Sequence, residues 1–151
     1  MLLSDHIRIK KLSEQAVIPV YGSAAAAGAD LYACLENTDK VTIAPGETVM
    51  IPTGIAMEIP EGFAGLVYAR SGLASKKGLA PANKVGVIDA DYRGEIKVPL
   101  HNHSGETAVV EQNERIAPMI LTPFLRAVFE ECDELSDTER GENGFGSTGK
   151  K

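Results

Sequence analysis

The chain has 151 residues, with 15 lysines and arginines against 21 aspartates and glutamates, so its formal net charge is -6. This acidic balance argues against nucleic acid as the main partner, although a few local arginines can still hold one small polyphosphate. A hydrophobic content of 44% is enough for the core of one domain, and the absence of an apolar run of membrane-spanning length predicts no membrane partner.

The first part of the chain predicts one short strand followed by a mostly extended connector. Apolar and polar residues roughly alternate over 7–12, and Pro19 interrupts regular structure in the segment that follows. Residues 23–28 include a run of alanines, but this segment is too short for a stable helix and ends in glycine, so we expect a loop or a single turn.

Asp30 lies near the start of the next expected strand, 29–33. An aspartate directly after a turn often only caps that turn. It can equally supply a carboxylate to a hard cation such as Mg²⁺, directly or through water. Both interpretations of Asp30 stay open at this point.

Turn signals then recur every several residues, which is typical of a β-sandwich or a jelly roll. Strands are expected at 41–43 and 48–51, joined as a hairpin by the Pro-Gly turn between them, and again at 55–59 and 63–69. The abundance of glycine and proline, 15 and 8 residues, favours this arrangement over long helices.

A short helix is expected directly after these strands. Ser71 is placed to cap it and Gly78 to end it. Because a helix start offers free backbone N–H groups, Arg70 and the Ser71 hydroxyl can form a phosphate-binding corner. A capping serine also begins many helices that bind nothing.

The stretch 85–100 predicts an apolar strand over 85–88, a tight turn, and a second strand over 95–100 in which apolar and polar residues alternate. The turn carries Asp89, Asp91 and Tyr92, and Gly94 follows for an unusual backbone angle. A carboxylate beside an aromatic ring can activate a water while the ring packs on a sugar or a base. The plain alternative is a hairpin with a solvated acidic turn.

Other polar residues of the second half allow two interpretations each. Asn83 can pair with an imide edge, since an amide has a donor and an acceptor, or it can be an ordinary loop residue. His101 and His103 share one face of a strand, but without a third ligand nearby in sequence we expect ordinary surface or interface histidines. Further strands are expected at 107–110, at 114–121 despite Pro118, and at 125–129.

The last part of the chain predicts a mobile lid. One phenylalanine, Phe145, lies among glycines and hydroxyl residues with Arg140 upstream. Glycines let backbone N–H groups approach phosphate oxygens, and the phenylalanine can stack on a base. The order of residues is not that of a Walker A loop. The two cysteines, Cys34 and Cys132, make no metal-type spacing, so we expect reduced thiols in a cytoplasmic protein.

Taken together, five stretches closely resemble the motifs of the trimeric dUTP diphosphatases, or dUTPases. The family patterns are A-G-x-D-L, R-S-G-L, G-x-I-D-x-D-Y-R-G, G-E-R-I-A-Q and R-G-x-G-G-F-G-S-T-G, and here they lie at 27–31, 70–73, 86–94, 113–118 and 140–149. The third and fifth patterns in series are highly specific.

The resemblance implies an all-β distorted jelly roll of the dUTPase-like β-clip kind, assembled as a homotrimer with a swapped C-terminal arm. Residues 1–135 would form the β-barrel domain, and residues 136–151 a flexible lid over a neighbouring active site. The implied activity is Mg²⁺-dependent hydrolysis of dUTP to dUMP and diphosphate, which limits uracil in DNA and supplies dUMP for thymidylate synthesis.

The resemblance also implies residue roles around the nucleoside. Asp89 matches the general base that activates water for attack on the α-phosphorus, Tyr92 the ring under deoxyribose, and Asn83 the uracil-reading amide. Backbone groups near Val87, Ile88 and Lys97 match those that complete the base pocket.

Other roles concern the triphosphate. Arg70, Ser71 and Gly72 match phosphate ligands, and Asp30 resembles the acid that holds the metal through water. The residues that match the lid are Arg140, Phe145, Gly146, Ser147 and Thr148.

Pro118 departs from the family pattern, because it stands where the family usually has a glutamine that contacts the phosphate and metal-water region. Its loss of side-chain donors predicts weaker Mg²⁺–phosphate positioning or lower turnover. Asn143 replaces a glycine, and Gln112-Asn113 replaces a common Pro-Gly, both mild because asparagine tolerates a left-handed backbone.

Two other functions fit parts of the pattern. A dCTP deaminase-type enzyme shares this fold by resemblance, but the intact D-Y-R-G and the phenylalanine-bearing tail favour a dUTPase. A catalytically weak nucleotide-binding or signalling trimer is the alternative from another class, with Pro118 as its clue.

Overall fold

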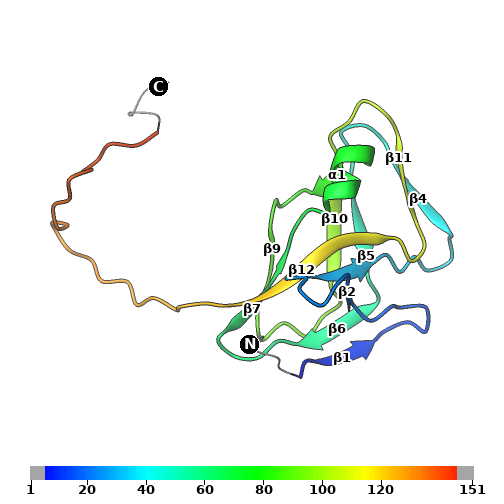
Figure 1. Cartoon of the computed structure of the whole chain (residues 1–151), viewed down its shortest axis with the longest axis horizontal. Helices are drawn as coiled ribbons and strands as arrows, with labels where there is room; N and C mark the ends of the chain where they lie inside the picture. Colours follow the sequence, from blue (N-terminus) through cyan, green and yellow to red (C-terminus); the bar gives the residue numbers. More distant parts are fainter. Residues whose placement is uncertain (1–5, 146–151) are drawn as a thin grey trace.

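The computed structural model describes residues 6–145, and over this range the chain consists of short strands and one short helix (Figure 1). In chain order the elements are β1 (Arg8–Lys11), β2 (Val20–Tyr21), β3 (Ala29–Tyr32), β4 (Lys40–Ile43), β5 (Thr48–Pro52), β6 (Ile55–Glu58), β7 (Phe63–Val67), α1 (Ser71–Lys77), β8 (Leu79–Pro81), β9 (Gly86–Ile88), β10 (Lys97–Asn102), β11 (Ala108–Glu111) and β12 (Arg115–Pro123).

The strands form several small antiparallel sheets. The largest has the order β2-β3-β12-β7-β9, and a second has the order β5-β10-β8. Two further pairs, β1 with β6 and β11 with β4, complete the arrangement. The expected all-β fold, a distorted jelly roll, is confirmed.

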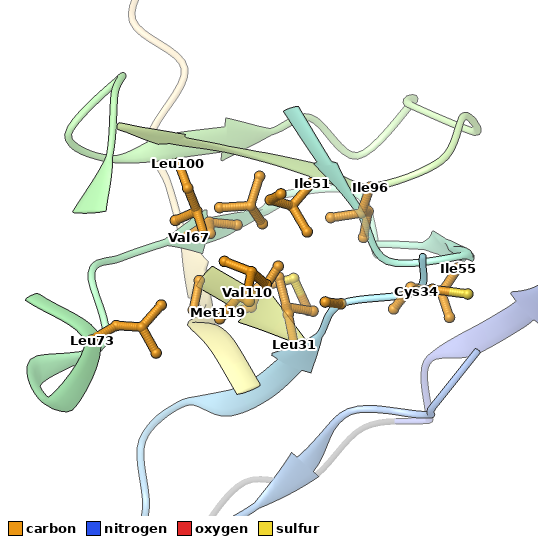
Figure 2. Packing of buried hydrophobic residues seen from close by; sticks show 14 of the residues in the cluster. Leu31, Cys34, Ile51, Ile55, Val67, Leu73, Ile96, Leu100, Val110 and Met119 are labelled. Atoms are coloured by element: carbon orange, nitrogen blue, oxygen red, sulfur yellow. The ribbon is translucent and has the colours of Figure 1, made fainter. Parts of the chain in front are cut away.

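One continuous core joins these sheets (Figure 2). Burial alternates along β10, where Val98, Leu100 and Asn102 are buried and the residues between them are not. This period of two is what a strand with one face on the core requires. Leucine, isoleucine, valine and alanine supply most of the buried side chains, in keeping with an aromatic content of 5%.

The predicted hairpin at 41–51 is wrong in its pairing, although its turn is present. The N–H of Glu47 donates to the carbonyl of Ala44 at 3.0 Å, as a tight turn requires. However, β4 pairs with β11 and β5 pairs with β10, so the chain crosses from one sheet to another at this turn. A local turn signal does not reveal which sheet each flanking strand joins.

The helix ends as predicted but begins differently. Gly78 has a left-handed backbone (φ 64°) and caps α1, as expected. At the other end the N-cap residue is Arg70, without a side-chain capping hydrogen bond, so the prediction that Ser71 caps the helix is wrong by one position. Ser71 is instead the first helical residue.

The strand expected at 125–129 is absent from the structure. After β12 the chain leaves the body and runs away from it (Figure 1). Leu125, Val128 and Phe129 are 92%, 97% and 95% exposed. The prediction failed because β propensity makes a strand only where a sheet edge is available to pair with.

Within residues 6–145, no helix has the length and apolar character needed to cross a membrane.

Candidate active site

The central stretch forms an open fork instead of the predicted hairpin. On one side β9 pairs with β7, whereas β10 pairs with β5 and β8, so the two strands belong to different sheets. A cavity of about 350 Å³ lies between them. The separation of β9 from β10 matters for function. In a closed hairpin the two strands would be joined by backbone hydrogen bonds, and no cavity would remain between them.

The cavity brings together all the residues that the sequence assigned to the nucleoside end of the site. These are Asn83, Val87, Ile88, Asp89, Tyr92 and Lys97.

The turn that carries Asp89 and Tyr92 is braced by its own hydrogen bonds. The N–H of Tyr92 donates to the carbonyl of Asp89 at 3.1 Å, and its hydroxyl donates to the carbonyl of Glu95 at 2.8 Å. Arg93 Nη1 donates to the carbonyl of Ala90 at 2.6 Å. The aromatic ring is thus held in one orientation at the wall of the cavity, within three residues of the carboxylate.

Gly86 gives the amide of Asn83 room at the cavity. A β-carbon on Gly86 would lie 3.3 Å from Asn83 Nδ2 and 3.3 Å from Val67 Cβ, tighter than most real contacts. Asn83 also sits in a sharp bend, because Lys84 has a φ of 65° and the N–H of Val85 donates to the Asn83 carbonyl at 2.7 Å. The side chain is exposed and can reach a ligand.

Two apolar residues of the cavity wall escaped the sequence analysis. Met50 on β5 lies opposite Pro99 on β10, and both line the cavity. Met50 is 56% exposed although its neighbours Val49 and Ile51 are more buried. A methionine on the outward face of a strand was the available signal. Without knowledge of the strand pairing, the sequence could not place this methionine at the cavity.

The residues assigned to phosphate lie away from this cavity. Gly86 is opposite Val67 and Ile88 is opposite Gly65, so Asp89 follows one end of the β7–β9 pair. Arg70, Ser71 and Gly72 follow the other end, beyond Val67, and none of them lines the cavity. Within one chain, the structure therefore separates the residues assigned to the nucleoside from the residues assigned to phosphate.

Asp30 also lies outside the cavity. It faces Pro118 across the β3–β12 pair, and Arg115 Nη1 lies 3.4 Å from its Oδ2. The Asp30 side chain is only 17% exposed. Pro118 offers no side-chain polar group, but its carbonyl accepts the N–H of Tyr68 at 3.0 Å, and the β3–β12 register shifts between Arg115 and Ala117.

The donor set around Asp30 is compatible with Mg²⁺ held by water and phosphate. Among residues 6–145, no group of three or more histidine, cysteine, aspartate or glutamate side chains is arranged to hold a metal ion. Mg²⁺ needs no such group, because it usually keeps several waters and binds one or two carboxylates together with substrate phosphates.

His101 shares a hydrogen bond with Thr48, whose Oγ1 lies 2.9 Å from the histidine Nδ1.

The predicted lid is only partly described. Arg140 Nε donates to the carbonyl of Asn143 at 2.7 Å, and Phe145 is fully exposed. Neither residue contacts the cavity of its own chain. Gly146, Ser147 and Thr148 lie outside the described residues, so their assignment remains a prediction.

Comparison with known proteins assigns the chain. The family model described as dUTPase matches residues 14–149. This chain belongs to the dUTPase family. The expectation from the five motifs is confirmed, and the match extends across the cavity, the phosphate segment and the arm.

Relatives agree along nearly the whole length. The deoxyuridine 5'-triphosphate nucleotidohydrolase of Hydrogenobaculum sp. (strain Y04AAS1) is 49% identical over 143 residues, covering 95% of this chain and 97% of the relative. That of Nautilia profundicola is 49% identical over 144 residues, covering 95% and 99%. As a dUTPase, this chain is an enzyme, a nucleotidohydrolase of dUTP.

Solved structures of phage dUTPases share the fold. A mutant of the Staphylococcus bacteriophage 80alpha dUTPase with dUpNHpp has a TM-score of 0.86 and 28% identity, covering 97% of this chain and 99% of that one. A mutant dUTPase from phage phi11 of S. aureus, which coordinates a structural Mg(II) ion, has a TM-score of 0.76 and 25% identity, covering 86% and 98%.

Proposed function

We propose that this dUTPase converts dUTP to dUMP and diphosphate by a water that the Asp89 carboxylate activates. The observation that carries the proposal is the cavity between β9 and β10, which gathers Asp89, Tyr92 and Asn83 around one space of nucleoside size. A carboxylate, an aromatic ring and an amide at one cavity suit a general base, a sugar platform and a base reader.

The chemistry requires positioning more than covalent catalysis. Asp89 accepts a proton from a water molecule, and the water oxygen bonds to the α-phosphorus. The bond from the α-phosphorus to the bridging oxygen breaks, so the electron pair leaves with diphosphate and dUMP remains. The braced turn at 89–92 supports this role, because a fixed carboxylate holds the water in line with the leaving group.

Base and sugar choice follow from the same cavity. The Asn83 amide presents one donor and one acceptor to the imide edge of uracil, a pattern that the 4-amino group of cytosine does not match. The fixed ring of Tyr92 packs under deoxyribose and leaves no room for a 2′-hydroxyl. Backbone groups near Val87, Ile88 and Lys97 complete the pocket.

We further propose a homotrimer in which each site takes its phosphate ligands from other copies. Arg70, Ser71 and Gly72 of a second copy grip the triphosphate, and the arm with Arg140, Phe145 and the following hydroxyl residues closes over it. Two observations support this. Arg70, Ser71 and Gly72 lie beyond the end of the β7–β9 pair that is opposite to Asp89, and residues 124–143 are exposed. Both features leave a single chain with an incomplete site.

The metal of the proposed reaction is Mg²⁺. Asp30 would hold it through water, beside the phosphates, and the ion supplies neutralising charge to the triphosphate when bound. Arg115, at 3.4 Å from the Asp30 carboxylate, fixes the direction in which that carboxylate points.

The test compares two neighbouring acids of one turn. Asp89→Asn should reduce release of diphosphate from dUTP by about 10³-fold or more while the fold and dUMP binding persist, because the amide cannot accept the proton. Asp91→Asn is the matched control, since Asp91 lies in the same turn but does not line the cavity. Full turnover by the Asp89→Asn enzyme would refute the assignment of the base. Assays with dTTP, dCTP and UTP in parallel measure the proposed base and sugar choice.

A further inference from the structure

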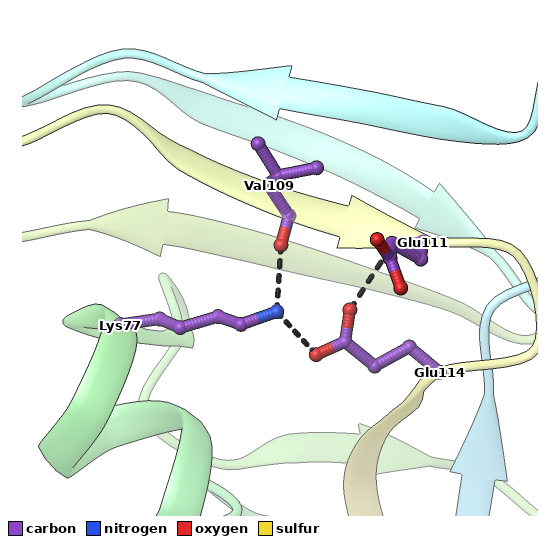
Figure 3. Close-up of polar contacts among 4 residues, drawn as sticks. All are labelled: Lys77, Val109, Glu111 and Glu114. Carbon is purple, nitrogen blue, oxygen red and sulfur yellow. Dashed lines mark hydrogen bonds and ion pairs between the residues drawn. The ribbon is translucent and has the colours of Figure 1, made fainter.

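The C-terminal end of α1 is fastened to the β11–β12 turn by one lysine (Figure 3). Lys77 Nζ donates to the carbonyl of Val109 at 2.8 Å and to Glu114 Oε1 at 2.5 Å. The other oxygen of Glu114 accepts the N–H of Glu111 at 2.9 Å. A single carboxylate therefore bridges the helix and the turn, using both of its oxygens.

This ion pair is half-buried. The Lys77 and Glu114 side chains are 37% and 21% exposed, compared with 83% and 43% for Arg8 and Glu58 on β1 and β6. Exposed pairs contribute little, because water and salt screen them. A half-buried pair with extra hydrogen bonds on both partners holds one geometry more firmly than a fully exposed pair.

The helix needs such a fastening. It has only seven residues, which is too short to be stable alone, and Leu73 is its buried residue. Its N-cap, Arg70, makes no side-chain capping bond. Tertiary contacts must therefore set the direction of α1, and with it the placement of Arg70, Ser71 and Gly72 at its start.

The fastening also reaches Asp30. Glu114 is followed by Arg115, which pairs with Asp30, and the carbonyl of Glu114 accepts the N–H of Ala33 at 2.9 Å. The turn at 111–114 is thereby tied to β3 on one side and to α1 on the other. Displacing Glu114 would move both the start of the helix and the guanidinium that orients Asp30.

We propose that Lys77 and Glu114 are positioning residues that align the phosphate-gripping segment with the Asp30 carboxylate. This inference rests on the proposed function, in which Arg70 to Gly72 and Asp30 hold the triphosphate. Neither Lys77 nor Glu114 lines the nucleoside cavity, and neither is assigned a contact with the nucleotide. Their loss should weaken recognition of the β- and γ-phosphates and leave recognition of the nucleoside unchanged.

The experiment measures binding of dUMP and of dUpNHpp to the full-length enzyme by calorimetry, at one fixed Mg²⁺ concentration. For Lys77→Met we expect dUMP affinity within about twofold of the wild type and dUpNHpp affinity about tenfold lower. The reason is that a displaced α1 no longer aligns Arg70, Ser71 and Gly72 with the triphosphate. Glu114→Gln should lower dUpNHpp affinity by a similar factor. The double variant should lose no more affinity than either single variant, since both substitutions break the same ion pair. Lys77→Arg should restore most of the loss.

Control variants separate the possible outcomes. Glu58→Gln removes the exposed ion pair on β1 and β6 and should change neither affinity. A ratio of the two affinities that stays at the wild-type value in Glu114→Gln and Lys77→Met overturns the proposal, as does an equal loss for both ligands, which would indicate general destabilisation. Arg70→Ala tests the underlying assignment: if it also preserves the ratio, the phosphate role of the segment fails, and the inference falls with it.

Discussion

Gly94 allows the Tyr92 ring to fold back over its own turn. A β-carbon at position 94 would lie 2.5 Å from the Tyr92 hydroxyl oxygen and 2.7 Å from Cζ, far closer than atoms can approach. The hydroxyl meanwhile donates to the carbonyl of Glu95 at 2.8 Å. The orientation of the ring therefore depends on the absence of a side chain two residues later.

Gly94→Ala should loosen sugar discrimination. In the proposed site, the new methyl group must displace the Tyr92 ring. This displacement widens the space beside the 2′ position of the sugar and removes the surface on which deoxyribose packs. We expect kcat/KM for dUTP to fall about tenfold or more, and the preference for dUTP over UTP to fall by a similar factor. Steady-state kinetics on both nucleotides measure the two effects.

Gly105→Ala is the matched control for this variant, because a β-carbon there meets nothing within 4 Å. It should leave both kinetic constants unchanged. An unchanged dUTP-to-UTP preference in Gly94→Ala would show that the ring position does not set sugar choice.

At the scale of elements, Asn102 joins the end of β10 to the turn that follows it and to β4, 59 positions earlier in the chain. Its Nδ2 donates to the carbonyls of Ile43 at 2.9 Å and Glu106 at 2.8 Å, and its Oδ1 accepts the Ser104 N–H at 3.0 Å and hydroxyl at 2.8 Å. The side chain is completely buried. It links the end of β10 to β4 and to the turn before β11.

Asn102→Ala should lower the free energy of unfolding by about 3 kcal/mol, because buried carbonyls and an N–H lose their partners. Ser104→Ala, which removes a hydroxyl at a half-buried site, should lower it by only about 1 kcal/mol. Urea unfolding at one fixed protein concentration gives both values, since concentration affects the stability of an oligomer. Equal losses in the two variants would contradict the central role of Asn102.

The positions of strands could be predicted from the sequence, but their partners could not. Alternation located β1 and β10, and the left-handed glycine located the end of α1, because these signals act within a few residues. The partner of β4 is β11, more than sixty positions away, and no local signal encodes that choice. For the same reason, the sequence predicted that β9 and β10 would pair as a hairpin, whereas they belong to different sheets.

At the scale of the whole molecule, the motifs predicted a set of site residues but not their geometry. The motifs identified Asp89 and Arg70 together, yet one chain holds only the former at the cavity. The cavity wall at Met50 and Pro99 depends on a strand pairing, so no motif announced it. A sequence pattern indicates which groups the chemistry needs but not which copy of the chain supplies each of them in the proposed assembly.

The exposed arm gives the sharpest test of the proposed assembly. Leu125 and Phe129 are 92% and 95% exposed in one chain, an arrangement that favours burial against another copy. Replacing both by serine should remove about 3 kcal/mol or more of apolar burial per chain, roughly a hundredfold in the dissociation constant. Sedimentation analysis should then show the proposed trimers dissociating on dilution. Specific activity should fall in parallel, because a separate chain no longer has the Arg70, Ser71 and Gly72 of another copy at its own cavity. Glu130→Gln, within the same segment, should change neither property. A double serine variant that keeps its trimer and its activity at every dilution would show that these side chains do not hold the assembly together.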